Sequence, residues 1–548
     1  MIPRSDARSG PMESGRRRFF LHLAAPAAAL ALLVAMIALS RDFGATWDER
    51  ALQKLGELIW DLYGGRISRP DFFGSFELNF GYTRIYGLLV EFLSTAAQHV
   101  VPGDLWIVRH YINAIFGWAG VVFAFLMASR WFGQRAGWLA AVLLLCMPRY
   151  VADSMNNPKD LPFAVLMLAA SYYILSVRTE YPYFSWSHAL KLAATIALAI
   201  NVRSMGLMLL GYTGLALAIA VAASRDFEPR RLAAAAGRYA VIGVLALVGG
   251  CVFWPWAQEQ PLTRPFEAFF MASGFNWGNP SLFMGQAVGG GAVPWYYLPT
   301  WLAITVPIVV LVGMAFAAMR VALPTPSRAR LAALWGLLLF PAIAAMVRHL
   351  SLYDGVRHML FIVVPMAVLA AAGWDFLFRS VPRKTLALAA GAFAVMIAEP
   401  FLFQIRNHPN QAVYFTPMAG GPRGAFGRYD MDYWGNCVLE ATEWAASQAE
   451  RAGIPLGIAS NAWEVLAMDA GRFNTLYFRQ QRHTGWHLNV ILLKGSPEHI
   501  AESAANPGAL YSVRTADGTP LCVVLPGPEY PQVQGRLSSV AASTRAGR

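Results

Sequence analysis

Residues 20–49 read FLHLAAPAAALALLVAMIALSRDFGATWDE, and they indicate the class of fold. Residues 20–39 are almost all apolar and are long enough to cross a ~30 Å hydrocarbon layer as a helix. They follow the basic cluster Arg16–Arg18, as the apolar part of a cleaved signal peptide also would. No clear small-x-small cleavage site precedes the polar stretch, so we expect an uncleaved membrane span.

Runs of the same kind recur along the chain. Of the 548 residues, 56% are hydrophobic and 14% charged, whereas soluble domains carry about 25% charged residues. This composition excludes a soluble enzyme, a fibrous protein and a disordered chain. We predict an α-helical polytopic membrane protein with about eleven spans. The candidate spans are 20–39, 107–128, 136–150, 161–177, 188–202, 204–223, 238–256, 295–318, 331–346, 356–377 and 383–402.

The net charge of +12 comes largely from arginines in alternate loops. Because basic loops stay in the cytoplasm, this charge pattern indicates how the chain is oriented in the membrane. It therefore gives no reason to expect a nucleic-acid partner. The Arg- and Ala-rich composition suggests a bacterial inner membrane. The basic loops are 129–137, 178–190, 224–238, 319–330 and 378–384. The segments predicted to face outward are 40–106, 148–160, 201–204, 257–294, 347–355 and everything after 403.

These patterns divide the chain into three parts. Residues 1–402 form the transmembrane domain, with 40–106 as its first outer loop. Residues 403–525 form a small extracytoplasmic α/β domain, because a helical stretch near 438–452 precedes β-like runs at 488–493 and 521–525. Residues 526–548 are rich in Ser, Ala and Gly and are predicted to be a disordered tail. Four cysteines are too few for a disulfide framework, so we expect Cys437 and Cys522 to be thiols rather than a bridge.

The sequence TWDE at 46–49 starts the first outer loop's helix. Residues 51–62 place apolar side chains at helical spacing, which predicts an amphipathic helix on the membrane surface. A capping box with Thr46 as N-cap would explain Glu49 but gives Asp48 no structural duty. The helix N-terminus favours an ionised Asp48, as a general base requires. Asp48 is therefore the first catalytic candidate and Glu49 the second.

Further charged residues stand where outer loops enter spans. Lys159 and Asp160 precede one span, where the cation can meet a lipid phosphate or the lysine can simply snorkel. Arg203 lies between two spans and needs an anionic partner, for which Asp48, Asp160 and a bound phosphate are the alternatives. The third cluster contains Tyr353, Asp354, Arg357 and His358, for which an interfacial Asp–Arg pair is the alternative interpretation.

Two other patterns carry no chemistry. Asp430-Met431-Asp432 is a DxD sequence, which in soluble glycosyltransferases holds the metal of a nucleotide sugar. Nucleotide sugars are cytoplasmic and this segment is predicted outside, so we interpret it as structural. The ten histidines show no metal-ligand spacing, so no structural zinc site is predicted.

The order of these features resembles the GT-C fold membrane glycosyltransferases of the family 39 and family 83 type. They include protein O-mannosyltransferases and the aminoarabinose transferase of lipid A. The resemblance covers about residues 20–440. It is carried by Asp48-Glu49, by Asn157-Pro158-Lys159-Asp160, by Tyr353-Asp354-Gly355-Val356-Arg357-His358, by Gly420-Gly421 with Gly424-Ala425-Phe426-Gly427, and by Asp432-Tyr433-Trp434-Gly435.

The resemblance implies an inverting transfer from a polyprenyl-phosphate sugar at the outer membrane face. Asp48 would deprotonate the acceptor hydroxyl, and cations would meet the charge on the departing phosphate. Arg84 stands where lipid A enzymes have a lysine motif, and it would substitute for that lysine. The other phosphate-binding candidates are Lys159, Arg203, Arg357 and His358, with Asp160, Asp354 and Tyr353 in support.

No nucleotide or redox cofactor is implied, because the donor carries its own activation. The Asp-Glu pair leaves a role for a divalent cation open. The acceptor can be an envelope glycan, a lipid or a protein. Two alternative functions remain at this point. One is a transporter or lipid flippase, which usually places its charges near mid-span, and the other is a non-catalytic scaffold for envelope assembly.

Overall fold

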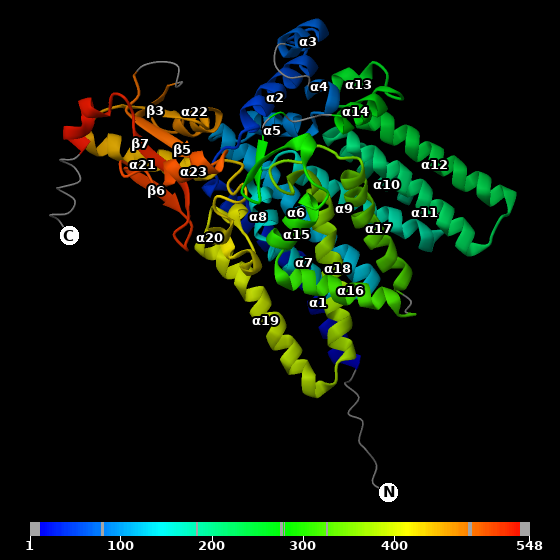
Figure 1. Cartoon of the computed structure of the whole chain (residues 1–548). Coiled ribbons are helices and arrows are strands. Elements are labelled where there is room, and N and C mark those ends of the chain that lie inside the picture. Colours follow the sequence, from blue (N-terminus) through cyan, green and yellow to red (C-terminus); the bar gives the residue numbers. More distant parts are fainter. Residues whose placement is uncertain are drawn as a thin grey trace.

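The computed structural model describes residues 11–77, 82–181, 185–274, 278, 280–324, 327–479 and 485–537 (Figure 1). A helical bundle carries an outer layer of short helices, and a C-terminal α/β domain lies beside that layer. The bundle helices are α1 (Pro11–Leu39), α6 (Leu105–Phe132), α7 (Gln134–Leu145), α9 (Asp160–Glu180), α10 (Trp186–Val202), α11 (Met208–Ser224), α12 (Pro229–Gly250), α16 (Ile308–Ala322), α17 (Arg328–Val347), α18 (Leu360–Ser380) and α19 (Arg383–Arg406).

The eleven predicted spans all coincide with helices, so the chain is a multi-pass membrane protein. Within the described residues, eight helices are long and apolar enough to cross a membrane, and two bent pairs raise this number to ten. The remaining predicted span, 188–202, is the shorter apolar helix α10. The helix at the predicted span 238–256 is α12, which begins earlier, at Pro229, and ends at Gly250.

Two predicted spans are wrong as single helices. The span at 136–150 breaks between α7 and α8 (Pro148–Asn156), which meet at 71°, and the span at 295–318 breaks between α15 (Tyr297–Thr305) and α16, which meet at 115°. Each break lies at a proline, Pro148 or Pro307. Proline disfavours helical backbone in the residue before it.

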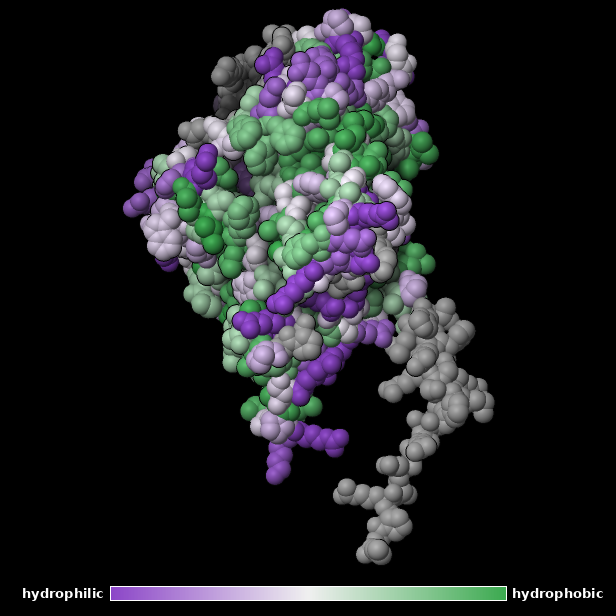
Figure 2. Space-filling model, turned by 90° about the vertical axis from the view of Figure 1, so that its right-hand side faces the viewer, coloured by the Kyte–Doolittle hydropathy of each residue, from purple (hydrophilic) through white to green (hydrophobic). Residues whose placement is uncertain are grey.

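The centre of the bundle is formed by α9 and α18, which are 83% and 89% buried over their apolar windows. Helix α18 packs against α16, where a Cβ added to Gly373 would lie 1.9 Å from the Gly313 carbonyl oxygen. Only a residue without a side chain permits this close approach. Helices α1 and α19 lie at the periphery and are 11% and 6% buried. On the face seen in Figure 2, hydrophobic side chains form a band below the polar upper end.

The outer layer includes the predicted amphipathic helix. This helix is α2, and its apolar residues Leu52, Leu55 and Ile59 pack against Phe72 and Leu88. The expectation that this face lies on the membrane is therefore wrong, because neighbouring protein covers it. The elements of this layer are α2 (Glu49–Tyr63), α3 (Arg69–Glu77), α4 (Tyr82–Ile85), α5 (Leu89–Val100), α8, α13 (Pro255–Gln258), α14 (Arg264–Ser273), β1 (Pro280–Phe283), β2 (Gln286–Gly289), α15 and α20 (Gly421–Ala425).

The C-terminal domain has a mixed five-stranded sheet in the order β4-β3-β5-β7-β6, in which β3 pairs in parallel with β4 and β5. The predicted helix and both predicted strands are present as α21, β5 and β7. Strand β7 ends at Pro526 and residues 530–537 are helical, so the segment predicted to be disordered begins with regular structure; residues 538–548 lie outside the described part. The elements are α21 (Cys437–Ala452), β3 (Leu456–Ser460), α22 (Trp463–Ala470), β4 (Leu476–Phe478), β5 (Leu488–Leu492), α23 (Pro497–Ala504), β6 (Tyr511–Arg514) and β7 (Pro520–Pro526).

A disulfide joins α21 to β7, which corrects the expectation of free thiols. Cys437 and Cys522 have Cα atoms 6.0 Å apart, a separation that suits a disulfide. Cys146 and Cys251 are free and buried. Sequence spacing gave no sign of the bridge, because 85 residues separate its two cysteines.

Candidate active site

The loop that carries Asp48 is held by the C-terminal domain. The Gly44 amide donates to Asn436 Oδ1 at 3.0 Å, and the Ala45 amide donates to Asp469 Oδ1 at 3.1 Å. Asn436 is itself fixed, because the Asp432 carboxylate accepts its backbone N–H at the start of α21. Two side chains distant in sequence therefore set the backbone just before Asp48.

Asp48 and Glu49 differ sharply in their surroundings. Glu49 is 1% exposed, accepts the Thr46 amide at 2.8 Å and lies 3.1 Å from His110 Nε2. Glu49 thus makes one half of the predicted capping box. The other half is absent, because Asp48 precedes the first residue of α2 and the Thr46 hydroxyl donates to Glu49 and to the Asn156 carbonyl. Asp48 is half-buried, and its carboxylate makes no hydrogen bond or ion pair within the described part of the chain. Its carboxylate is available to a ligand.

The cations predicted at the span entrances are brought together. Arg203 forms an ion pair with Asp160, one of its three expected partners. The Lys159 ammonium lies 4.9 Å from the centre of the Tyr86 ring, and the Arg203 guanidinium lies 5.6 Å from the same ring. One aromatic ring thus contacts two cations.

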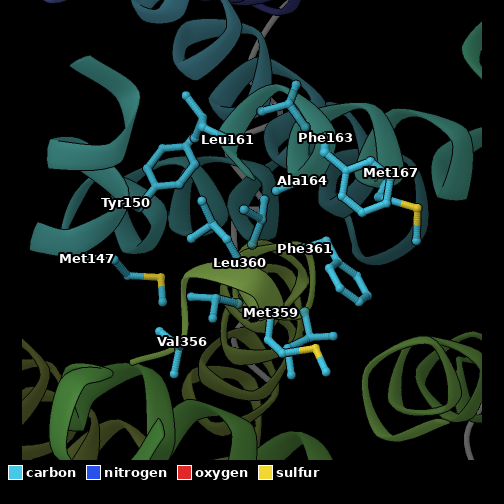
Figure 3. Close-up of a cluster of buried hydrophobic side chains, with 14 of the residues drawn as sticks. Met147, Tyr150, Leu161, Phe163, Ala164, Met167, Val356, Met359, Leu360 and Phe361 are labelled. Carbon is cyan, nitrogen blue, oxygen red and sulfur yellow. The ribbon is translucent and has the colours of Figure 1, made fainter. Parts of the chain in front are cut away.

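A buried hydrophobic cluster fixes the spacing of these cations from the third predicted group. Figure 3 shows Tyr150 of α8 and Leu161 of α9 on one side of this cluster, and Val356, Met359 and Leu360, where α18 starts, on the other. All five side chains are at least nine-tenths buried. Asp160 precedes Leu161 and Arg357 follows Val356 in the chain, so packing of the cluster limits how far these two charged groups can shift.

Arg357 is flanked by two aromatic rings and by a neighbouring acid. Its guanidinium carbon lies 4.8 Å from the Trp434 ring centre and 5.0 Å from that of Tyr353, while Asp354 is 3.8 Å away. Its buried Nε has no hydrogen-bond partner among the described residues. The charges of Asp48 and Asp160 both act on it. Arg357 therefore retains capacity to bind an anion.

Asp354 has a closer partner, Lys494, whose ammonium lies 2.8 Å from its carboxylate. Although burial opposes it, the charges of Lys494 and Arg357 hold the pKa of Asp354 below its usual range. Burial lowers the pKa of Lys494, but the charges of Asp354 and Asp430 outweigh burial and raise it. The predicted Asp–Arg pair is thus one side of a larger cluster, in which Lys494 neutralises Asp354 and leaves Arg357 less engaged.

An apolar cavity of about 340 Å³ opens next to these cations. Arg203, Tyr353 and His358 line one end of it, and η2 (Ser204–Leu207), α11, α14 and α17 form its walls. We call it the apolar cavity. Its apolar lining includes Ile85, Met205, Met208, Phe269, Phe270, Phe340, Pro341 and Met359.

The remaining predicted residues fall at different distances from this centre. Arg84 is exposed on α4 and does not line the apolar cavity, although Ile85 and Tyr86 do. Residues 80 and 81 of the same segment lie outside the described part. The DxD pair is structural as interpreted, because Asp432 caps α21 and Asp430 accepts the Leu282 amide at 2.9 Å. Burial raises the pKa of Asp430 to about 7.

Sequence reasoning missed the contribution of the C-terminal domain. Trp434, Asn436, Asp469 and Lys494 all contact the site from that domain. Trp434 belongs to a segment that carried the resemblance, which was a usable signal. Isolated polar residues such as Asp469 give no local signal. No group of three His, Cys, Asp or Glu side chains suited to a metal ion occurs in the described residues.

Comparisons with known proteins agree with the predicted resemblance. Residues 88–256 match the sequence model of the dolichyl-phosphate-mannose-protein mannosyltransferase family, which covers about a third of the chain. The match spans Lys159, Asp160 and Arg203. It confirms the resemblance to membrane glycosyltransferases over that segment. A comparison with curated proteins gave no match.

Solved structures with a similar arrangement include two membrane glycosyltransferases. ArnT from Cupriavidus metallidurans bound to undecaprenyl phosphate gives a TM-score of 0.48 at 15% identity, over 91% of this chain and 98% of that one. The oligosaccharyltransferase AglB from Archaeoglobus fulgidus, in complex with an inhibitory peptide and a dolichol-phosphate, gives 0.45 at 11% identity, over 93% of this chain and 77% of that one.

Proposed function

We propose that the protein transfers a sugar from a polyprenyl-phosphate donor to an acceptor hydroxyl at the outer face of the membrane. One observation carries the proposal: the apolar cavity ends at Arg203 and His358, beside Arg357 and within electrostatic reach of the unpaired Asp48. An isoprenoid chain suits the apolar walls. Its phosphate suits the cationic end.

The chemistry is a single displacement with inversion. Asp48 takes the proton from the acceptor hydroxyl as its oxygen bonds to the anomeric carbon, and the bond from that carbon to the phosphate oxygen breaks. Polyprenyl phosphate leaves with the electron pair. Arg203, Arg357, His358 and Lys159 surround the developing charge and favour its departure.

The outward orientation rests on two observations. Basic loops, including the α11–α12 and α18–α19 turns, point away from the C-terminal domain (Figure 1). The Cys437–Cys522 disulfide suits an oxidising compartment such as a bacterial periplasm. We therefore propose that the bundle lies in a bacterial inner membrane with the site extracytoplasmic.

The test uses purified protein in detergent with a panel of labelled polyprenyl-phosphate sugars and an envelope fraction as acceptor. Release of polyprenyl phosphate is followed for the wild type, for Asp48→Asn and for Asp61→Asn, which makes the same change at an exposed position of α2. We expect Asp48→Asn to lose about 10²–10⁴-fold in rate, as removal of a general base does, while Asp61→Asn keeps the wild-type rate.

Equal release by Asp48→Asn would contradict the assignment of the base, and Glu49→Gln would then be tested. Each assay is repeated with EDTA to decide the divalent-cation question. If no donor is consumed while the protein scrambles polyprenyl-phosphate lipids in vesicles, the flippase alternative replaces the transferase.

A further inference from the structure

A second hollow, of about 760 Å³, lies between α2, the N-terminus of α6 and α22 of the C-terminal domain. We call it the polar cleft. Its volume falls in the range of ligand sites, about 300–1,000 Å³. One helix face of α2 lines it with Arg50, Gln53, Lys54 and Glu57, and Arg472 faces them from beyond α22. No residue of the polar cleft lines the apolar cavity.

The polar cleft begins next to Asp48. Arg50 is two residues further along the chain, about 3 Å of helix rise. Glu464 of α22, the helix on the other side of the polar cleft, interacts electrostatically with Asp48, with Arg50 and with Lys54. The charge of Asp48 also acts on Tyr353, which lines the apolar cavity. Asp48 lines neither hollow, but its charge reaches residues at both, as the base of a transfer reaction between donor and acceptor requires.

The lining of the polar cleft alternates in sign. Gln53 donates to Glu57 at 3.0 Å, and Arg472 lies 3.3 Å from Asp104. Ligand hydroxyls can accept from guanidinium, ammonium and amide groups and donate to carboxylates, so a polyhydroxylated ligand matches both signs. An anionic ligand matches less well, because the carboxylates of Glu57 and Asp104 line the polar cleft along with the cations Arg50, Lys54 and Arg472.

Two tryptophan side chains provide aromatic surface at or next to the polar cleft. Trp106 lines the polar cleft, and the Arg50 guanidinium lies 5.5 Å from the ring centre of Trp463, which is 38% exposed. Broad indole faces beside a few placed polar groups are typical of pockets for small polar ligands. We propose that the polar cleft binds the acceptor and that this acceptor is a neutral oligosaccharide. The inference rests on the proposed function and names its acceptor class.

The first test measures binding without turnover. The full-length protein in detergent is titrated with maltotetraose, cellotetraose, mannotetraose and chitotetraose, and with tetragalacturonate as the anionic counterpart, by saturation-transfer NMR. The variant is Arg50→Met/Lys54→Met. The matched control is Lys191→Met, an exposed lysine on the bundle helix α10.

We expect at least one neutral tetrasaccharide to bind, with a dissociation constant raised at least 10-fold in the double variant and unchanged in Lys191→Met. Tetragalacturonate should bind more weakly. Binding of undecaprenyl phosphate should be the same in all three proteins, which also shows that the double variant is folded. The proposal is overturned if no neutral tetrasaccharide binds, if the double variant binds it like the wild type, or if tetragalacturonate binds best.

A second measurement separates this inference from the proposed function. Where the wild type releases polyprenyl phosphate with the envelope fraction, the double variant should need at least 10-fold more acceptor for half-maximal rate, at an unchanged half-saturating donor concentration. An unchanged acceptor requirement overturns the acceptor site and leaves the transferase standing. Tetrasaccharide binding without any donor consumption overturns the transferase and leaves a glycan-binding cleft.

Discussion

The apolar cavity and the polar cleft both lie within electrostatic reach of Asp48, but they are built from different parts of the chain. The apolar cavity is walled by bundle and outer-layer helices, with cations at one end. The polar cleft is walled by α2, the start of α6 and the C-terminal domain, with charges of both signs. The difference indicates that donor and acceptor are recognised by different means, burial of a lipid chain with its phosphate and hydrogen bonding of a glycan.

The largest effect on stability is expected from breaking the Arg203–Asp160 ion pair at the end of the apolar cavity. Arg203→Met leaves Asp160 as an unpaired buried carboxylate, which typically costs ~3–5 kcal/mol. The double variant Arg203→Met/Asp160→Leu should recover most of that stability, but not the binding of undecaprenyl phosphate. Apparent melting in detergent and lipid titration measure the two quantities.

Arg231→Met is the matched control, because Arg231 pairs with Asp226 where both are partly exposed. Such pairs contribute about 0–1 kcal/mol. If the double variant melts no higher than Arg203→Met, Arg203 stabilises the protein by something other than its pair with Asp160.

A smaller loss is expected from Arg357→Met. Removing one preorganised group that stabilises developing charge typically lowers the rate about 10²–10³-fold. We expect this loss in polyprenyl-phosphate release, with tetrasaccharide binding unchanged because the polar cleft lies on the other side of Asp48. Arg379→Met, at the far end of α18, provides the control. If Arg357→Met lowered polyprenyl-phosphate release and tetrasaccharide binding to the same extent, the two hollows would not be separate sites.

The two hollows also differ in how far the sequence predicts them. Lys159, Arg203, Arg357 and His358 stand at the ends of apolar runs, where any charge is conspicuous. The sequence therefore points to Arg203 and His358, which line the apolar cavity, but not to Arg348, which lines it as well. The polar cleft was not predicted. Arg50 and its neighbours on α2 are ordinary residues of an amphipathic helix, and only tertiary folding places a domain more than 400 residues away against them.

The same reasoning explains errors within the bundle. Hydropathy locates a span but does not indicate a bend within it. The break between α7 and α8 could have been predicted only from the backbone restrictions that Pro148 imposes. Asp48 was separated from Glu49 by a capping argument, and the structure shows the Glu49 half of that capping box but not the Thr46 half. Local rules of this kind are predictable, whereas the contact of Asn436 with Gly44 spans 392 residues and is not.

That contact gives the next prediction. Asn436→Ala removes the acceptor of the Gly44 amide, and a buried unpaired donor costs about 1–3 kcal/mol. We expect kcat to fall about 10-fold, because the loop before Asp48 loosens, at an unchanged half-saturating donor concentration. Asn506→Ala, an exposed change in the same domain, should leave kcat unaltered. A fall in stability without a fall in kcat would show that the loop needs no support from α21.

The most gradual expected effect is a pH slope in stability at Asp469, which holds the other amide of the loop. Burial raises the pKa of Asp469 from 3.8 to about 7. The folded protein therefore binds this proton more tightly than the unfolded chain does. Stability falls as pH rises from about 4 to about 7, by at most ~1.4 kcal/mol for each pH unit.

Asp469→Asn keeps an oxygen that accepts the Ala45 amide and cannot ionise. We expect this variant to remove its share of the slope in apparent melting between pH 4 and 7, and to be at least as stable as the wild type at pH 8. Asp61→Asn, at an exposed site, should keep the wild-type slope. A steeper slope in Asp469→Asn would mean that the carboxylate form holds the loop through Arg472, whose guanidinium lies 3.9 Å away. The C-terminal domain would then stabilise the Asp48 loop most strongly at alkaline pH, which is the reverse of the pH dependence expected from the burial of Asp469.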